Sequence, residues 1–203
     1  MKKILKPNIL ILGSSRSGKT TLGNKICKKY KYNLISLDNL VSAFQKGLPE
    51  LNISHDDRSG ISVKKITPFV IQYIKSLTSY VQQIKNINYV IEGCYFDLDE
   101  LKSIFNSKLI VIVITRNLLS SKDLFDELKE HDEEWDWTSK LSDSELLNYC
   151  DNLVANNQYI KEFCESNDIK YIDVSLDRNR KLKKILYDVG SEIKEKSKIV
   201  ELN

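Results

Sequence analysis

The feature that most constrains this chain is a phosphate-binding motif close to its amino terminus. Residues 13–20 read Gly-Ser-Ser-Arg-Ser-Gly-Lys-Thr, which matches the pattern G-x-x-x-x-G-K-[ST]. A short apolar run from Asn8 to Leu12 precedes the motif, and an amphipathic stretch from Thr20 to Lys31 follows it. A buried strand, a glycine-rich loop and a helix form the context in which such a loop binds phosphate. The motif therefore predicts an α/β fold.

Each residue type in the loop has a chemical reason. Gly13 and Gly18 let the backbone curl so that successive N–H groups converge on phosphate oxygens. Lys19 can reach the β- and γ-phosphates of ATP, and the Thr20 hydroxyl can ligate Mg²⁺. Arg16 either leans over the phosphates or stays solvated. The residues expected to bind Mg·ATP are Gly13, Ser14, Ser15, Arg16, Ser17, Gly18, Lys19, Thr20 and Thr21.

The rest of the chain alternates short apolar runs with longer amphipathic ones. Further strands are predicted at 33–37, 88–91, 108–115 and 169–174, and helices at 20–31, 64–85, 97–105, 117–130, 142–166 and 181–195. The tail after Ser197 is expected to be loose. This alternation predicts a parallel sheet covered by helices on both faces. Ligands bind beyond the carboxyl ends of such strands, where Gly13, Asp38, Glu92 and Arg116 stand.

Length and composition point to one globular domain, taken as 1–203. The chain has 203 residues, of which 41% are apolar and 29% charged. Its longest strongly apolar stretch, 109–114, is far shorter than the ~20 residues of a membrane helix, so no membrane partner is expected. A net charge of +3 is too small to indicate nucleic acid. The four cysteines form no CxxC pair, which suits a reducing cytoplasm.

Two carboxylates stand where a phosphoryl-transfer site needs them. Glu92 ends a buried apolar run and is the candidate to support Mg²⁺, with a solvated strand-end glutamate as the alternative. Asp38 follows the second strand, where it could orient and deprotonate an acceptor hydroxyl. Its alternative is to cap a helix that starts at Asn39, and the two roles are compatible.

Residues in two further segments are candidate contacts for the acceptor. Arg58 is the only arginine between positions 17 and 115, so it is a natural contact for an acceptor anion. Loop charge clusters such as Asp56-Asp57-Arg58 are more often simply solvated. Tyr95 and Phe96 come shortly after Glu92 and could line an acceptor pocket.

These segments resemble the P-loop small-molecule kinases, which include nucleoside monophosphate kinases, shikimate-type kinases and nucleoside kinases. The resemblance rests on GSSRSGKTT, LISLD, YVIEG and ITR, each at the end of a predicted strand. It implies a three-layer fold with a five-stranded parallel sheet in the order 2-3-1-4-5. It also implies a helical lid after the fourth strand, here residues 117–143. By similarity, Arg116 at the start of this lid and Arg178 after the fifth strand would contact the nucleotide.

The expected lid departs from the resemblance in its charge. From Lys122 to Asp136 there are eight acidic residues and two lysines, whereas nucleoside monophosphate kinases usually supply several arginines here. Such a surface argues against a nucleic-acid partner and favours a neutral or cationic acceptor that carries a hydroxyl. The alternative is a solvated helix face. Trp135 and Trp137 could stack on a flat substrate or anchor the lid helix.

The sequence therefore predicts a kinase that moves the γ-phosphoryl group of Mg·ATP to a small-molecule acceptor, at a hydroxyl rather than a phosphate. The expected catalytic residues are Lys19, Asp38, Glu92 and Arg116. The expected ligands are Asp38, Arg58 and Tyr95 for the acceptor, and Thr20 and Glu92 for Mg²⁺. The alternative is a non-catalytic or regulatory P-loop nucleotide-binding protein, and a monomer or a homodimer is expected. A GTP-binding switch would need an NKxD motif, which the sequence lacks.

Overall fold

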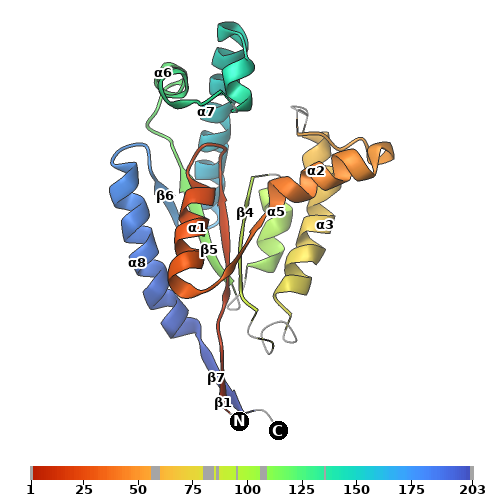
Figure 1. Cartoon of the computed structure of the whole chain (residues 1–203), viewed down its shortest axis with the longest axis vertical. Helices are drawn as coiled ribbons and strands as arrows, with labels where there is room; N and C mark the ends of the chain where they lie inside the picture. Colours follow the sequence, from red (N-terminus) through yellow and green to blue (C-terminus); the bar gives the residue numbers. More distant parts are fainter. Residues whose placement is uncertain are drawn as a thin grey trace.

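A five-stranded parallel sheet forms the centre of the protein, with helices on both faces (Figure 1). The computed structural model describes residues 2–55, 60–79, 85, 87–94, 96–105, 109–134 and 136–201. The strand order is β3-β4-β2-β5-β6, which is 2-3-1-4-5 when the strands of this sheet are counted along the chain. The predicted fold class and strand order are confirmed.

The strands of the central sheet are β2 (Asn8–Gly13), β3 (Asn33–Ser36), β4 (Tyr89–Gly93), β5 (Leu109–Thr115) and β6 (Tyr171–Asp173). The helices are α1 (Lys19–Tyr30), α2 (Leu37–Gly47), η1 (Pro49–Leu51), α3 (Ile61–Leu77), α5 (Leu98–Leu101), η2 (Lys102–Ile104), α6 (Ser121–His131), η3 (Trp137–Lys140), α7 (Asp143–Ser166) and α8 (Arg178–Lys196). Two short strands, β1 (Lys2–Leu5) and β7 (Lys198–Glu201), lie outside the sheet.

The alternation of side chains along β2 divides the core in two. Ile9 and Ile11 pack into a cluster with residues of α1 and α8, while Leu10 and Leu12 pack with residues of α2, α3, α5 and α7. Successive side chains of a strand point to opposite faces, so a central strand covered on both sides has to be apolar throughout. The same physics explains the apolar run of β5, which pairs with β2 in parallel.

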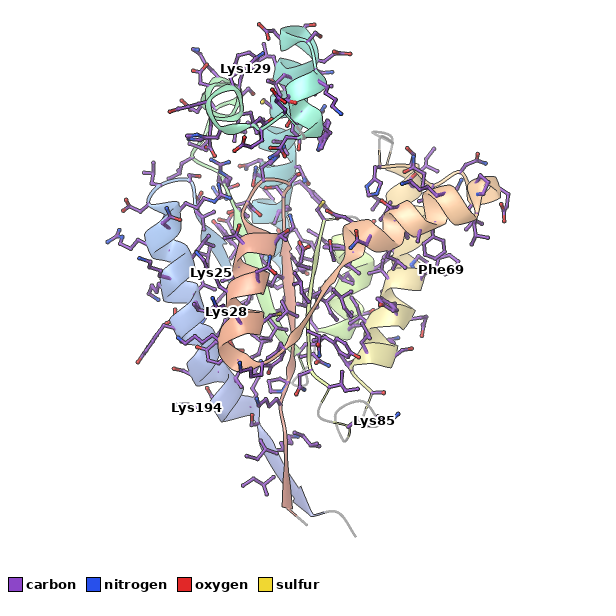
Figure 2. All side chains as sticks on the ribbon, in the orientation of Figure 1. Lys25, Lys28, Phe69, Lys85, Lys129 and Lys194 are labelled. Atoms are coloured by element: carbon purple, nitrogen blue, oxygen red, sulfur yellow. The ribbon has the colours of Figure 1, made fainter. Side chains whose placement is uncertain are left out.

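A third, smaller cluster lies away from the sheet, within the predicted lid. It joins α6 to the amino-terminal half of α7 and consists of Leu124, Leu128, Leu146, Cys150 and Leu153. Capping boxes that begin at Ser120 and Ser142 start these two helices. Helix α6 and the amino-terminal half of α7 stand beyond the carboxyl end of the sheet, where Lys129 marks α6 (Figures 1 and 2).

The structure corrects the prediction of a loose tail after Ser197. Strand β7 pairs antiparallel with β1, and Ile199 lies opposite Ile4. This ribbon projects from the end of the molecule opposite the lid (Figure 1). The pairing partner lies at the other end of the chain, so no local pattern near residue 198 could reveal it.

Several predicted elements are present with shifted ends. Helix α3 ends at Leu77, so the predicted helix to Lys85 is too long, and residues 80–84 lie outside the described residues. Helix α6 begins at Ser121 rather than at residue 117. Among the described residues, no helix combines the length and the apolar character needed to cross a membrane.

Candidate active site

Residues 13–20 connect β2 to α1 at the carboxyl end of the central strand (Figure 1). Gly13 has a φ of 146°, and a Cβ at this position would collide with the carbonyl oxygen of Ile114 on β5. Gly18 has a φ of 96° and immediately precedes α1. A Cβ at Gly18 would lie 3.2 Å from the guanidinium group of Arg178. Both glycines of the motif are therefore required by the path of the backbone and by the close packing around it.

The Lys19 side chain is buried and folds back over the loop. It is 6% exposed, and its Nζ donates a hydrogen bond of 2.6 Å to the backbone carbonyl oxygen of Ser14. This bond holds the ammonium group close to the loop, where Lys19 is expected to contact the phosphates of the nucleotide. Lys19 also lies close enough to Glu92 to lower the pKa of that carboxyl group.

Glu92 lies at the end of β4 and is only 1% exposed. It is therefore not a solvated strand-end residue. Hydroxyl groups of Ser36 and Thr20 hydrogen-bond to it and, with the Lys19 charge, favour its ionised form. Burial outweighs these effects, so the pKa of Glu92 is raised above its ordinary value.

Asp38 is the second residue of α2, which begins directly after β3. The N-cap position belongs to Ser36, so the alternative role of Asp38 as a helix cap is wrong. Its Oδ1 atom is buried and has no hydrogen-bond partner within the described residues. Asp38 contributes to raising the pKa of Glu92 and that of the Cys94 thiol, although burial is the main cause for both. The two carboxylates thus share one region, at the ends of β3 and β4.

The polar atoms of this region fit a magnesium-bound nucleotide. Ser17 is fully buried, and its Oγ has no partner in the part of the chain that the structure describes. The unpartnered Oδ1 of Asp38 belongs to a carboxylate that lies close enough to Glu92 to raise its pKa. Thr20 and Glu92, which hydrogen-bond to each other, present the oxygen ligands that Mg²⁺ prefers.

Three arginines from distant parts of the chain surround the loop: Arg16 within it, Arg116 after β5 and Arg178 at the start of α8. The Arg116 side chain is 4% exposed, and its guanidinium group donates a hydrogen bond to Glu127 of α6. The Arg178 Nη1 atom lies 3.6 Å from Oε1 of the same Glu127. One lid carboxylate therefore bridges two of the arginines.

Arg16 joins the loop to the lid. Its guanidinium nitrogens lie 3.3 Å from a carboxylate oxygen of Asp132 and 3.4 Å from one of Asp136. It also donates a hydrogen bond of 2.6 Å to Oγ1 of Thr138, whose hydroxyl donates to Asp132. Arg16 is thus paired with the lid rather than free in solvent.

The acidic segment of the lid is therefore not one uniform solvated face. Glu127, Asp132 and Asp136 turn toward arginines of the site, and these pairs neutralise part of its negative charge. Asp123 belongs to the capping box of α6, and Asp126 pairs with the exposed Lys122. The lid acids that face the arginines connect the lid to the phosphate-binding loop.

An aromatic side chain of the lid packs against one of α7 that lies beside the loop. Trp137 packs edge-on against Tyr149 of α7, with 4.9 Å between the ring centroids. The Tyr149 hydroxyl lies beside Ser15 of the loop. This packing favours an anchoring role for Trp137, whereas Trp135 lies outside the described residues. A small cavity between the end of β4 and α7 is lined by Gly13, Cys94, Phe96, Leu98, Asn156, Tyr159 and Ile160.

The structure brings together some of the predicted site residues and leaves others untested. Arg58 and Tyr95 lie outside the described residues, so their roles stay predictions. Thr21 is exposed on α1. Sequence reasoning missed Asn157, which is 2% exposed on α7 and contacts both the loop and the lid. A single asparagine in a long helix carries no signal that could have identified it.

Solved structures of similar fold were found by structural comparison. A shikimate kinase from Bacteroides thetaiotaomicron aligns with a TM-score of 0.53 and 15% identity over 95% of this chain and 99% of that chain. A gluconokinase from Sinorhizobium meliloti aligns with a TM-score of 0.52 and 16% identity over 94% and 95% of the two chains. The chain has the fold of the P-loop small-molecule kinases. A sugar kinase from Janibacter aligns with a TM-score of 0.52 and 12% identity over 91% of this chain and 95% of that chain. No protein-family model matches the sequence, and no curated protein matches it significantly.

Proposed function

We propose that the protein is a kinase that transfers the γ-phosphoryl group of Mg·ATP to a hydroxyl group of a small-molecule acceptor. The observation that carries this proposal is the meeting of Lys19, Asp38 and Glu92 at the carboxyl ends of neighbouring strands, with a buried Asp38 oxygen left free to accept a hydrogen bond from a ligand. The fold supports it, because the structures that share this fold include kinases.

The position of each site residue supports a specific role in phosphoryl transfer. The N–H groups of residues 13–18 and the start of α1 can bind phosphate oxygens. Lys19 would neutralise negative charge as the phosphoryl group is transferred, and Asp38 would accept the proton of the attacking hydroxyl. Thr20 and Glu92 would hold Mg²⁺, which, when bound, neutralises further charge on the phosphates.

The preference for a hydroxyl acceptor follows from where the charges lie. Arg16, Arg116 and Arg178 all pair with lid acids around the loop. Arg180, the other arginine in the described part of the chain, pairs with the exposed Asp177. A phosphate acceptor beside Asp38 would be repelled by the carboxylates of Asp38 and Glu92, whereas a hydroxyl acceptor would find a base in Asp38.

The proposal also covers domain organisation, location, partners and oligomeric state, for which the sequence gives the grounds. The proposed features are a single domain in which residues 117–143 move as the lid, a cytoplasmic location, a small-molecule partner rather than nucleic acid or membrane, and a monomeric or homodimeric state. ATP is the expected phosphoryl donor, and Arg116 and Arg178 are its expected contacts beyond the loop.

A thermal-shift and turnover experiment tests the proposal. Mg·ATP should raise the melting temperature of the wild type but not of Lys19→Ala, because a ligand that binds the folded state stabilises it by mass action. Lys28→Ala is the matched control, since Lys28 is exposed on the same helix (Figure 2). ADP release is then measured with sugars, sugar acids, shikimate-like acids, nucleosides, nucleoside monophosphates and aminoglycosides.

The outcomes separate the two candidate functions. Acceptor-dependent ADP release that requires Lys19 supports the kinase, and the active class identifies the acceptor. Lys19-dependent binding of Mg·ATP without turnover with any class supports the non-catalytic nucleotide-binding alternative. Absence of a Lys19-dependent shift would show that both are wrong.

A further inference from the structure

Asn157 occupies an unusual place on α7, at the boundary between two packed clusters. One turn before it, Leu153 belongs to the lid cluster that joins α6 to α7. One turn after it, Ile160 belongs to the core beneath the sheet. Helix α7 runs without interruption from the lid into the core. A tilt of the lid would therefore move the part of α7 that carries Asn157.

All the polar atoms of the Asn157 side chain are used. Its Oδ1 accepts a hydrogen bond of 2.7 Å from the Ser14 hydroxyl and one of 2.8 Å from the backbone N–H of Arg116. Its Nδ2 donates a hydrogen bond of 2.8 Å to the carbonyl oxygen of Leu153. A carbonyl oxygen has two lone pairs, so these two donors saturate Oδ1, and the Nδ2 bond holds the amide in this orientation.

We propose that Asn157 is a positioning residue that couples nucleotide binding at the phosphate-binding loop to the position of the lid. This inference rests on the proposed function, because it assumes that the loop binds Mg·ATP. Asn157 acts on the site through its hydrogen bonds with the Ser14 hydroxyl and the Arg116 N–H.

The coupling runs through a continuous chain of contacts. The Lys19 ammonium group donates to the carbonyl oxygen of Ser14, and the hydroxyl of the same Ser14 donates to Asn157. Asn157 then accepts from the N–H of Arg116, whose guanidinium group bonds Glu127 in the lid. A phosphate that displaces Lys19 or Ser14 therefore changes the forces on Asn157 and, through it, on the start of the lid.

The start of the lid is also held from its other side. The N–H of Asn117 donates to Asp173 at the end of β6, and the N–H of Leu118 donates to the Ser175 hydroxyl. These bonds attach the start of the lid to the sheet, whereas the Asn157 bond attaches it to the loop. Loss of the Asn157 bond would remove this connection to the start of the lid, whereas the contacts of Arg16 would still join the loop to residues 132–138.

The test uses Asn157→Leu, which keeps a side chain of similar size but removes both acceptor bonds. Asn152→Leu is the matched control, because Asn152 is exposed on the same helix. Amide hydrogen exchange of residues 116–131 is measured in the full-length protein with and without Mg·ATP. The wild type and the control should gain protection when the nucleotide binds, and Asn157→Leu should lose most of this gain.

Affinity and kinetics provide the second readout. In Asn157→Leu, KM for ATP should rise and kcat/KM should fall on the order of 10- to 100-fold, since small misplacements of binding groups have effects of this size. A purely structural role would lower the melting temperature and the yield of folded protein. It would leave KM and the exchange response of the folded fraction unchanged, and this result would overturn the proposal.

Ser14→Ala keeps the test decisive if Asn157→Leu does not fold. It removes one of the two bonds to Oδ1 and should weaken the exchange response in the same direction. An unchanged response in this variant would overturn the proposal, as would a wild type whose lid does not respond to Mg·ATP. If the lid responds through Asn157 but no acceptor is phosphorylated, the coupling stands and the kinase function fails.

Discussion

The carboxyl group of Glu92 illustrates, at the scale of one residue, how burial sets the chemistry of this site. It is almost fully enclosed, and burial raises its pKa although Lys19 and two hydroxyl groups favour the charge. Burial therefore disfavours the ionised carboxylate more than Lys19 and the two hydroxyl groups favour it. A cation at this position would reverse the balance, as expected of a residue that supports Mg²⁺.

The raised pKa of Glu92 predicts how stability depends on pH. Because its pKa is higher in the folded protein than the unfolded value near 4.5, the folded state binds this proton more tightly. The stabilisation is fully present below that unfolded pKa and is lost as pH rises through the folded pKa. As pH rises between the unfolded and the folded pKa, the free energy of unfolding of Glu92→Gln should therefore fall less than that of the wild type. Urea unfolding across a pH series measures this difference. Equal pH dependence in both proteins would contradict the prediction.

Asp38 gives a second prediction at this scale. Asp38→Asn keeps the size of the side chain but cannot accept the hydroxyl proton. We expect kcat to fall by about 10²–10⁴-fold, the usual contribution of a positioned general base. The thermal shift with Mg·ATP should be nearly unchanged, because Asp38 is not expected to bind the nucleotide. Steady-state kinetics with the identified acceptor measure the effect, and a variant that retains kcat would remove Asp38 from the mechanism.

At the scale of elements, the lid is connected to the loop by charge and to the core by one helix. Glu127 on α6 bonds the buried Arg116 and contacts Arg178, while Asp132 and Asp136 contact Arg16. Helix α7 carries the lid cluster at one end and core residues at the other. The lid therefore has a firm base and an ionic contact surface that a polyphosphate can compete for.

Glu127→Gln tests the ionic contact surface. The variant leaves the buried Arg116 without its acid partner, and hydrogen bonds to charged groups contribute about 1.5–3 kcal/mol. We expect amides of α6 to exchange roughly tenfold faster or more in the ligand-free protein, since about 1.4 kcal/mol corresponds to a factor of ten. Glu130→Gln, at an exposed position of the same helix, is the control and should change little. Equal exchange in both variants would show that the Glu127 pairs do not hold the lid.

At the scale of the whole molecule, the protein has two main clusters on the faces of the sheet and a separate cluster in the lid. Small clusters outside the main core open at lower free energy than the core itself. The lid should therefore unfold locally while the sheet stays intact, which would let a substrate enter without disturbing the strands that carry the site.

Leu124→Ala tests this separation. Removing a buried leucine side chain costs about 2–5 kcal/mol. If the lid is a separate unit, faster exchange should be confined to α6 and the amino-terminal half of α7, while amides of β2 and β5 keep their protection. Ile110→Ala, in strand β5 next to the central strand, is the comparison and should speed exchange throughout the protein. Global acceleration in Leu124→Ala would show that lid and core unfold together.

The sequence by itself determined the architecture and the phosphate-binding loop. The apolar runs of β2 and β5 predict strands buried on both faces, and the spacing of the glycines predicts a loop that only glycine can form at Gly13. These features are local, since each depends on residues that are neighbours along the chain. Alternation of strands and helices then predicts the parallel sheet, because parallel strands need a crossover between them.

Only the tertiary structure decided how distant residues meet. It placed Asp38 inside the first turn of α2, paired β7 with β1, and brought Asn157 between Ser14 and Arg116. It also turned three lid acids toward arginines, although in the sequence they resemble any solvated charged face. Such contacts depend on packing between segments far apart along the chain, and neither periodicity nor composition encodes which side chains that packing will bring within hydrogen-bond distance.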